Sequence, residues 1–235
     1  MCNIFLFDWG SIAGSHDFRA FLYNTAELQK VDLRDLQVSE ALPFWLNVYG
    51  ILLLHLYIMK RPPCDMTMFG RKSFFSTYKY NIGGLEYSLK DIEEGIIRNH
   101  IHKKFKEKDP RHRFALKTDP RAAFLIPLLA RTSPAVRVYT GGVGWDAVLT
   151  RCTEAFVQKF AEVDLDKKKI RLPDQAKEVY ENDFRGKKEE LMLWVSQFFS
   201  VDQKVQLERL MAITKKFSVS FDDFDWTPEP GFEEA

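Results

Sequence analysis

The chain has 235 residues, enough for one large domain or two small ones with a sizeable core. Its apolar content of 46% and charged content of 29% are typical of globular proteins, and a net charge of +1 gives no general attraction to nucleic acid or membranes. The three cysteines, Cys2, Cys64 and Cys152, form no CxxC pair, which argues against a zinc cage or a disulfide framework. The first residues lack the basic region of a secretory signal, so we expect a cytoplasmic protein. We also expect it to contain no metal and no other cofactor.

Residues 40–59 form the longest apolar stretch of the chain. Three polar side chains interrupt it: Glu40, Asn47 and His55. A helix with almost no polar face is typical of a protein core, and these polar groups would be costly in a transmembrane segment. We therefore expect a buried central helix, capped by Ser39, with Pro43 near its first turn.

Turn signals follow this stretch. Two prolines and a glycine in residues 60–70 predict the end of the central helix. Residues 73–80 have the composition of a strand, and the NIGG sequence of residues 81–84 predicts a turn into a second strand. Ser88 and Asp91 have nearly the spacing and chemistry of a capping box, which predicts that a new helix begins there.

The rest of the chain predicts short helices and strands. Helical spacing favours helices at residues 17–30, 145–160, 191–199 and 200–214, and alternation favours strands at residues 136–139, 169–172 and 217–221. Ser200 and Gln203 have the spacing of a capping box at the start of the last helix. The GGVG sequence of residues 141–144 predicts a turn, without the spacing of a phosphate-binding loop. Cys152 falls on the apolar side of its helix, which predicts a buried structural thiol.

These patterns predict the α+β class. We expect one helix-rich domain at residues 17–228, in which the buried central helix packs on a small, mostly antiparallel sheet. Residues 1–16 and 229–235 are expected to be frayed flanking termini.

Residues 98–117 are the most charge-asymmetric stretch, with a net charge of +6. One interpretation is an anion-binding patch that includes Lys103, Lys104, Arg111 and Arg113. The other, which we favour, is a solvated loop facing an acidic tail that comprises Asp222, Asp223, Asp225, Glu229, Glu233 and Glu234. The stretch offers few stacking side chains, which argues against a nucleic-acid groove.

Three ordered motifs carry a family resemblance. The first contains Glu40, Phe44, Trp45, Asn47, Tyr49 and His55, and the second contains Gly83, Gly84, Ser88, Leu89, Asp91, Ile92, Glu93, Gly95 and Arg98. The third contains Asp119, Pro120, Arg121, Phe124 and Pro134, along the pattern D-P-R-I-H-F-A-L-x-C-G-x-x-S-x-P. With the closing SVSFDDFDW sequence, these motifs make the chain resemble the domain of unknown function 547 family. Gly50 and Glu94 depart from the pattern, where the family has Asn and His.

The resemblance implies a cysteine-peptidase-like fold, with a Glu, an Asn, a His and a Cys gathered in a hydrolase site. In this chain the His position is Ala123, the Cys position is Leu128, and a further Cys of some members is Ser133. A thiol nucleophile needs a base, and neither group is present at these positions. Glu40 and Asn47 remain, and we expect them to bind loop backbone near residues 81–84 or 119–121.

The sequence therefore favours a non-catalytic protein-interaction or scaffold module, whose partner is another protein or a larger assembly. One alternative is an active hydrolase with a relocated nucleophile, such as Ser133 with His55 or Cys152 with His112, or with Glu40 as acid or base. Another is a peripheral binder of anionic lipid or nucleic acid through residues 98–117.

Overall fold

The computed structural model describes residues 9–60, 68–117, 119–214 and 216–227. Two compact units make up this part of the chain. Unit 1 contains the described residues up to 117 and the segment Val136–Val143, whereas unit 2 contains Asp119–Ala135 and Gly144–Thr227. Both units combine helices with a small sheet, which confirms the helix-rich α+β class. The single domain at residues 17–228 stays a prediction.

Several sequence features lie outside the described residues. They are Cys2, Cys64, the prolines after the central helix, and the tail residues Glu229, Glu233 and Glu234. Residues 9–14, expected as part of a frayed terminus, instead form helix α1. The predicted helix at residues 17–30 is present as an α-helix followed by a 3-10 helix.

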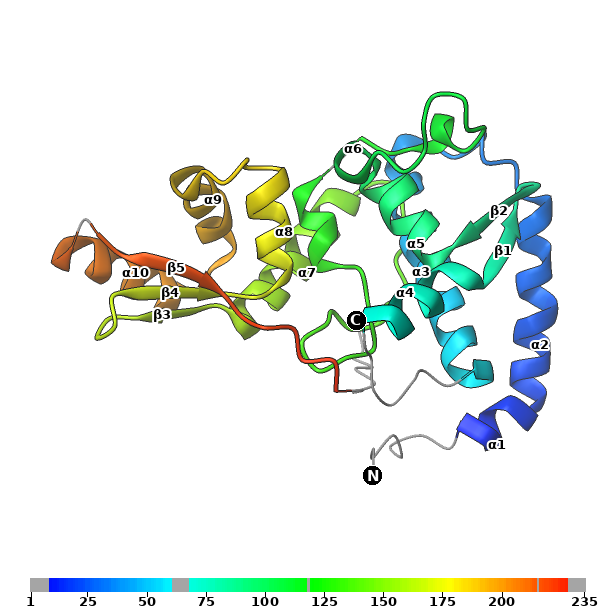
Figure 1. Cartoon of the computed structure of the whole chain (residues 1–235), viewed down its shortest axis with the longest axis horizontal. Helices are drawn as coiled ribbons and strands as arrows, with labels where there is room; N and C mark the ends of the chain where they lie inside the picture. The colour runs from blue at the N-terminus through cyan, green and yellow to red at the C-terminus, as the bar shows by residue number, and fades with distance from the viewer. Residues whose placement is uncertain (1–8, 61–67, 118, 215, 228–235) are drawn as a thin grey trace. The chain divides into compact units, whose positions relative to one another are not determined.

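Unit 1 consists of helices around one long helix and a hairpin (Figure 1). Its elements are α1 (Trp9–Gly14), α2 (His16–Thr25), η1 (Ala26–Lys30), α3 (Val38–Lys60), α4 (Met68–Thr77), β1 (Lys79–Ile82), β2 (Leu85–Ser88), α5 (Leu89–Asp91), the π-helix η2 (Ile92–Ile97), α6 (Asn99–His102) and η3 (His112–Phe114).

Helix α3 supplies much of the core of unit 1. Trp45, Leu46, Tyr49 and Leu53 are almost fully buried, and the Trp45 ring packs on the Tyr87 ring of β2 with centroids 4.9 Å apart. By length and composition α3 is also apolar enough to cross a membrane, and 56% of its most apolar stretch of 18 residues is buried inside the structure. The helix therefore packs on the hairpin, as expected for a central core helix.

The start of α3 differs from the prediction. The helix begins at Val38, so Ser39 lies inside the first turn and does not cap it. Pro43 also lies inside the helix, where its missing N–H leaves the Ser39 carbonyl without the usual intrahelical donor. The Gly142 N–H donates to this carbonyl over 3.3 Å, and so joins the segment Val136–Val143 to the first turn of α3.

The predicted turn at residues 81–84 is confirmed. Ile82 pairs with Leu85 across a two-residue turn in which Gly83 and Gly84 have φ values of 58° and 83°. Positive φ at both positions is the type I′ geometry that suits the twist of a hairpin. A Cβ on Gly83 would also lie 2.8 Å from the Val31 carbonyl oxygen, so this position has no room for a side chain.

The strand predicted at residues 73–80 is wrong over most of its length. Helix α4 continues to Thr77, and β1 begins only at Lys79. Phe74 is buried with its ring edge-on to the Tyr57 ring of α3, at a centroid distance of 5.7 Å. This packing overrides the strand preference of an aromatic and β-branched sequence.

The capping box that begins α5 is confirmed. The Ser88 hydroxyl accepts the Asp91 N–H over 3.1 Å, and the Asp91 carboxylate accepts the Ser88 N–H over 3.0 Å. The wider π-helical turn that follows was not predicted. Within it a Cβ on Gly95 would overlap the buried Phe105 ring, so a glycine there lets the ring pack against the backbone.

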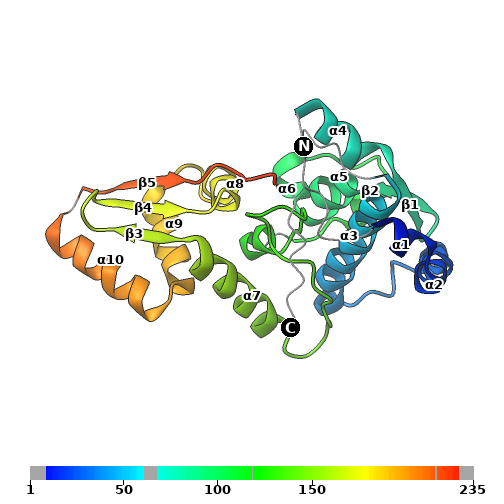
Figure 2. The same ribbon diagram turned by 90° about the horizontal axis from the view of Figure 1, so that it is seen from below.

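Unit 2 contains the remaining helices and a three-stranded sheet (Figures 1 and 2). Its elements are η4 (Pro120–Phe124), α7 (Trp145–Phe160), β3 (Glu162–Asp164), β4 (Lys169–Leu172), α8 (Gln175–Asn182), α9 (Lys188–Val195), η5 (Ser196–Phe198), α10 (Val201–Ile213) and β5 (Ser218–Phe221). Strand β4 lies in the middle, antiparallel to β3 and parallel to β5. The predicted helix at residues 145–160, the strands at 169–172 and 217–221, and the capping box of Ser200 and Gln203 are confirmed.

Candidate functional site

The residues of the family motifs fall in both units. Glu40 and Asn47 lie on α3 in unit 1, whereas Ala123, Leu128 and Ser133 lie in unit 2. Each set therefore has its own surroundings within its unit.

Asn47 binds the backbone of Tyr139. Its amide group donates to the Tyr139 carbonyl over 2.8 Å, and its side-chain oxygen accepts the Tyr139 N–H over 2.8 Å. These two bonds are the kind that a neighbouring strand would make, and residues 136–139 are a loop instead of the predicted strand. Asn47 thus binds loop backbone as expected, but at a different loop from those at residues 81–84 and 119–121.

Glu40 lies in the exposed first turn of α3. Its carboxylate accepts the Gln37 N–H over 3.3 Å, at the weak end of hydrogen-bond lengths. Gly141 packs against this turn, because a Cβ at that position would lie only 2.9 Å from the Glu40 Cα. The geometry assigns Glu40 and its neighbours to the contact between α3 and the segment Val136–Val143.

His55 contacts aromatic side chains from two other elements. Its Nδ1 lies 2.6 Å from the Tyr80 hydroxyl of β1, and the rings of Phe18 and Phe21 from α2 stand edge-on to it. Burial lowers the pKa of His55 and raises that of Tyr80. His55 therefore joins α3 to β1 and α2 as a neutral side chain at neutral pH.

Two basic residues of the stretch at residues 98–117 form ion pairs with acidic residues of unit 1. The Lys104 ammonium lies 3.2 Å from the Asp91 carboxylate, and the Arg111 guanidinium pairs with Asp109 at 2.8 Å and lies over the Phe105 ring at 4.0 Å. Burial would raise the pKa of Asp91, but hydrogen bonds from Ser88 and the charge of Lys104 outweigh it and lower the pKa. Lys104 thus neutralises Asp91 and Arg111 neutralises Asp109, both within unit 1.

The other residues of the basic stretch divide between surface and core. Lys103 and Arg113 are exposed, as an anion-binding patch requires, whereas Arg98 is almost fully buried. In the tail, Asp222 pairs with Arg171 at 3.1 Å and Asp225 with Arg131 at 3.7 Å. These two acids therefore have partners in unit 2, and the expectation that the tail faces residues 98–117 stays a prediction.

Tyr49 is another residue of the first motif, and it lies in the interior of unit 1. Its side chain is fully buried, and burial together with the nearby Glu93 carboxylate raises its pKa well above the usual value. A phenol that stays protonated can donate a hydrogen bond but cannot act as a base. The first motif therefore contributes to the core of unit 1 through Tyr49.

Arg121 connects two helices of unit 2. Its guanidinium donates to Asp119 over 2.7 Å, to Asp146 over 2.6 Å and to the Thr150 hydroxyl over 2.7 Å. These hydrogen bonds to Asp119 and Asp146 raise the pKa of Arg121. The Asp-Pro-Arg sequence of the third motif thus ties η4 to α7.

Ala123, Leu128 and Ser133 stand at the positions where the resemblance implies a base and nucleophiles. Ala123 is buried, with 6% of its surface exposed, and Leu128 carries an aliphatic side chain. The Ser133 hydroxyl donates to the Pro134 carbonyl over 2.9 Å and accepts the Leu128 N–H over 3.1 Å. A serine whose proton is held by a carbonyl lacks the base that activates a nucleophile.

Leu129, next to Leu128, adopts an unusual backbone conformation. It stands where the family pattern has Gly, and its φ is 52°, in the left-handed region that glycine adopts most easily. The side chain is nonetheless buried. The sequence signal for this conformation was the glycine of the family pattern.

Cys152 is less buried than predicted. It lies on α7 with intermediate exposure, in unit 2, whereas His112 lies in η3 of unit 1.

Among the described residues, no group of three His, Cys, Asp or Glu side chains is arranged to hold a metal ion.

Residues 33–157, just over half of the chain, match the family described as "Protein of unknown function, DUF547". The chain belongs to this family. Comparisons with curated proteins and with solved structures find no match. The segment that matches DUF547 ends within α7, so the part of unit 2 from β3 to β5 follows the matched residues.

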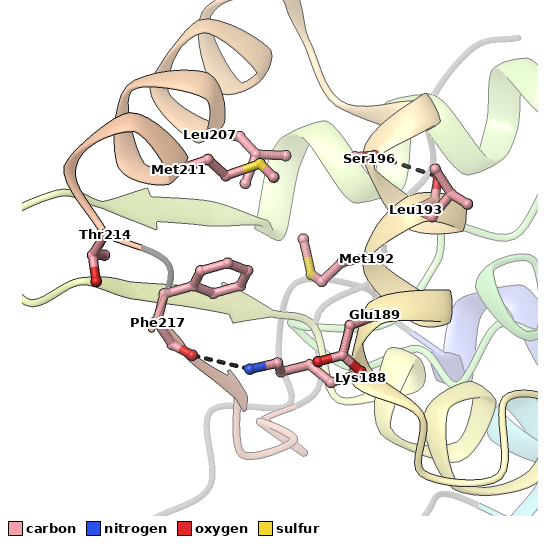
Figure 3. Close-up of a pocket in the computed structure, with 9 residues that line it drawn as sticks. All are labelled: Lys188, Glu189, Met192, Leu193, Ser196, Leu207, Met211, Thr214 and Phe217. Carbon is pink, nitrogen blue, oxygen red and sulfur yellow. Dashed lines mark hydrogen bonds between the residues drawn. The ribbon is translucent and has the colours of Figure 1, made fainter.

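A pocket of about 650 Å³ lies in this following part, between α9 and α10 (Figure 3). Met192 of α9 points toward Leu207 and Met211 of α10, and the Phe217 ring lies beside them. Its other lining residues are Lys188, Glu189, Leu193, Ser196 and Thr214. Of the residues of α10 itself, only Leu210 is buried.

Proposed function

We propose that this DUF547 protein is a non-catalytic protein-interaction or scaffold module. The observation that carries the proposal is the pair of residues at the family's base and nucleophile positions, Ala123 and Leu128. Neither methyl nor isobutyl groups can accept a proton or attack a carbonyl, and losing one such group alone removes orders of magnitude in rate.

The surroundings of the remaining motif residues support the same proposal. Asn47 uses both ends of its amide on the Tyr139 backbone, and Ser133 uses its hydroxyl on the backbone of Pro134 and Leu128. Polar groups that are satisfied in this way stabilise a fold without needing a substrate. The open pocket between α9 and α10 supplies apolar surface for a partner.

The first experiment is a hydrolysis assay with the full chain and panels of peptide, ester and amide substrates. We expect no turnover above the rate without protein. Ser133→Ala and Cys152→Ala variants serve as controls for contaminating activity. Turnover that either substitution abolishes would contradict the proposal and establish a relocated nucleophile.

The second experiment asks whether the protein functions in an assembly. The tagged full chain is purified from its native source and its mass is measured under native conditions. We expect a stable complex with stoichiometric partner protein. Recovery of only the free chain, together with measurable hydrolysis, would favour the enzyme.

An anionic ligand is the remaining alternative, and it has its own test. Lys103→Glu and Arg113→Glu should leave partner binding unchanged, because both side chains belong to the exposed part of the basic stretch in unit 1. Binding of the wild-type chain to anionic vesicles or RNA that falls steeply with salt would support this alternative instead.

A further inference from the structure

We infer that the pocket between α9 and α10 binds a basic amphipathic helix of a partner protein. This inference rests on the proposed interaction function and names the surface and the chemistry of the partner. Three apolar side chains, those of Met192, Leu207 and Phe217, line the inside of the pocket, and Met211 lies at its rim. Its volume of about 650 Å³ can hold several apolar side chains.

The rim indicates a macromolecular occupant. Leu193 is 75% exposed and Met211 is 58% exposed, although both border the pocket. A small molecule enclosed between the helices would leave such rim side chains in water. A protein segment that lies along the groove covers both the interior and the rim, and so removes more apolar surface from water.

The walls favour a helix as that segment. Both α9 and α10 are helices, and a third helix can place side chains at positions i, i+3, i+4 and i+7 in the groove between them. Methionine side chains are flexible and polarisable, and they adapt to apolar partners of different shape. Met192 and Met211 face each other from the two walls.

The charges at the rim select a basic partner. The Lys188 ammonium donates to the Phe217 carbonyl over 3.2 Å and lies over the Phe217 ring, so its charge is directed inward. Lys187 and Glu190 form an ion pair at 2.6 Å. Glu189 is exposed on the rim and has no ion-pair partner among the described residues. A lysine or arginine next to the apolar stripe of the partner would complement this carboxylate.

The test uses fluorescence anisotropy of labelled peptides with the full chain. The probe is a peptide of about 18 residues with leucines at helical spacing and lysines on the opposite side. Two comparison peptides have the same leucines with glutamates in place of lysines, and the same composition in scrambled order. We expect the basic helix to bind and both comparison peptides to bind at least about tenfold more weakly.

Substitutions on the rim locate the binding surface. Met211→Glu should weaken binding of the basic peptide by at least about tenfold, because it places a carboxylate among the apolar contacts. Glu189→Lys should shift the preference toward the acidic peptide. Val201→Glu is the matched control, since Val201 is an exposed apolar residue of α10 that does not line the pocket. Circular dichroism of each variant checks that the fold is intact.

Other outcomes overturn the inference. These are equal binding of the scrambled peptide, binding that Met211→Glu leaves unchanged, and the absence of peptide binding. Concentration-dependent self-association that Met211→Glu abolishes would assign the groove to a second copy of the chain. If the natural complex survives Met211→Glu, the interaction function stands and only this groove assignment fails.

Discussion

At the scale of single residues, Asn47 shows how a motif side chain can serve the fold. An asparagine side chain carries a carbonyl acceptor and an NH2 donor group in one plane, and so it can match the N–H and C=O of a single extended residue. Tyr139 presents both groups to it at 2.8 Å. The same chemistry would let an asparagine orient a catalytic partner, but here each end of the amide binds backbone.

We predict that Asn47→Asp destabilises the protein more than the small change in side-chain shape suggests. The carboxylate can accept the Tyr139 N–H but cannot donate to the Tyr139 carbonyl, which it faces at hydrogen-bond distance. The expected loss in the free energy of unfolding is about 1–3 kcal/mol at neutral pH. It should shrink in acid, where the introduced carboxyl group is protonated and can donate again. Urea denaturation of this variant and of Asn24→Asp, an exposed site in α2, measures the effect. Equal losses in the two variants would show that the amide contributes little.

A second residue-scale prediction concerns His55. Burial lowers the pKa of His55 in the folded protein, so the unfolded chain binds more protons near and below its usual pKa of about 6.5. The contribution of His55 to stability is therefore complete above this value and is lost as the pH falls toward the folded pKa. We expect the free energy of unfolding to rise between pH 5 and pH 7.

Denaturation of His55→Gln across this pH range checks the assignment. The slope of stability against pH should be smaller in the variant than in the wild type, by no more than about 1.4 kcal/mol per pH unit. His16→Gln is the control, because the His16 side chain is exposed. An unchanged slope in His55→Gln would assign the pH dependence to other groups.

At the scale of elements, the signals of capping boxes and of the glycine turn were confirmed, whereas the Ser39 cap and the strand at residues 136–139 were wrong. The capping boxes at Ser88 and Ser200 and the turn at Gly83 and Gly84 depend on residues at most three positions apart, and the structure contains all three. Residues 73–80 needed tertiary information, since the packing of Phe74 on Tyr57 decides between helix and strand.

The candidate sites divide in the same way. The motif residues could be listed from the sequence, because the family resemblance fixes them by spacing. The contact of Asn47 with Tyr139 could not be predicted, because 92 residues separate the partners. The pocket was also missed: helical spacing identifies the apolar side of α10, but not whether α9 lies close enough to bury it.

We predict that the two capping boxes differ in their contribution to stability. Ser200→Ala removes an N-cap at a partly buried helix start and should cost about 1 kcal/mol. Ser88→Ala removes the hydroxyl that also donates to the Asp91 carboxylate over 2.7 Å in a buried setting. This carboxylate then loses a hydrogen bond that it cannot replace with water, so the expected cost is about 2 kcal/mol or more. Chemical denaturation of both variants gives the difference, and a Ser88→Ala cost equal to that of Ser200→Ala would contradict it.

At the scale of the whole molecule, the open question is cooperativity. The sequence offered no linker and suggested one domain, whereas the contacts of the described residues gather in two compact units. The chain passes between these units several times, because the segment Val136–Val143 belongs to unit 1 and its flanking residues belong to unit 2. Repeated crossings favour joint unfolding, and separate cores favour independent unfolding.

Hydrogen exchange distinguishes these cases with one variant in each unit. Asn47→Ala weakens the contact of α3 with Tyr139 in unit 1, and Arg121→Ala removes the bonds that tie η4 to α7 in unit 2. We expect each variant to lower protection mainly in its own unit, by an amount equivalent to about 1–3 kcal/mol, because its partners all lie in that unit. Mass spectrometry of peptides from α3 and α7 reports the two units separately. If either variant lowers protection equally in both units, the chain unfolds as the single cooperative domain that the sequence suggested.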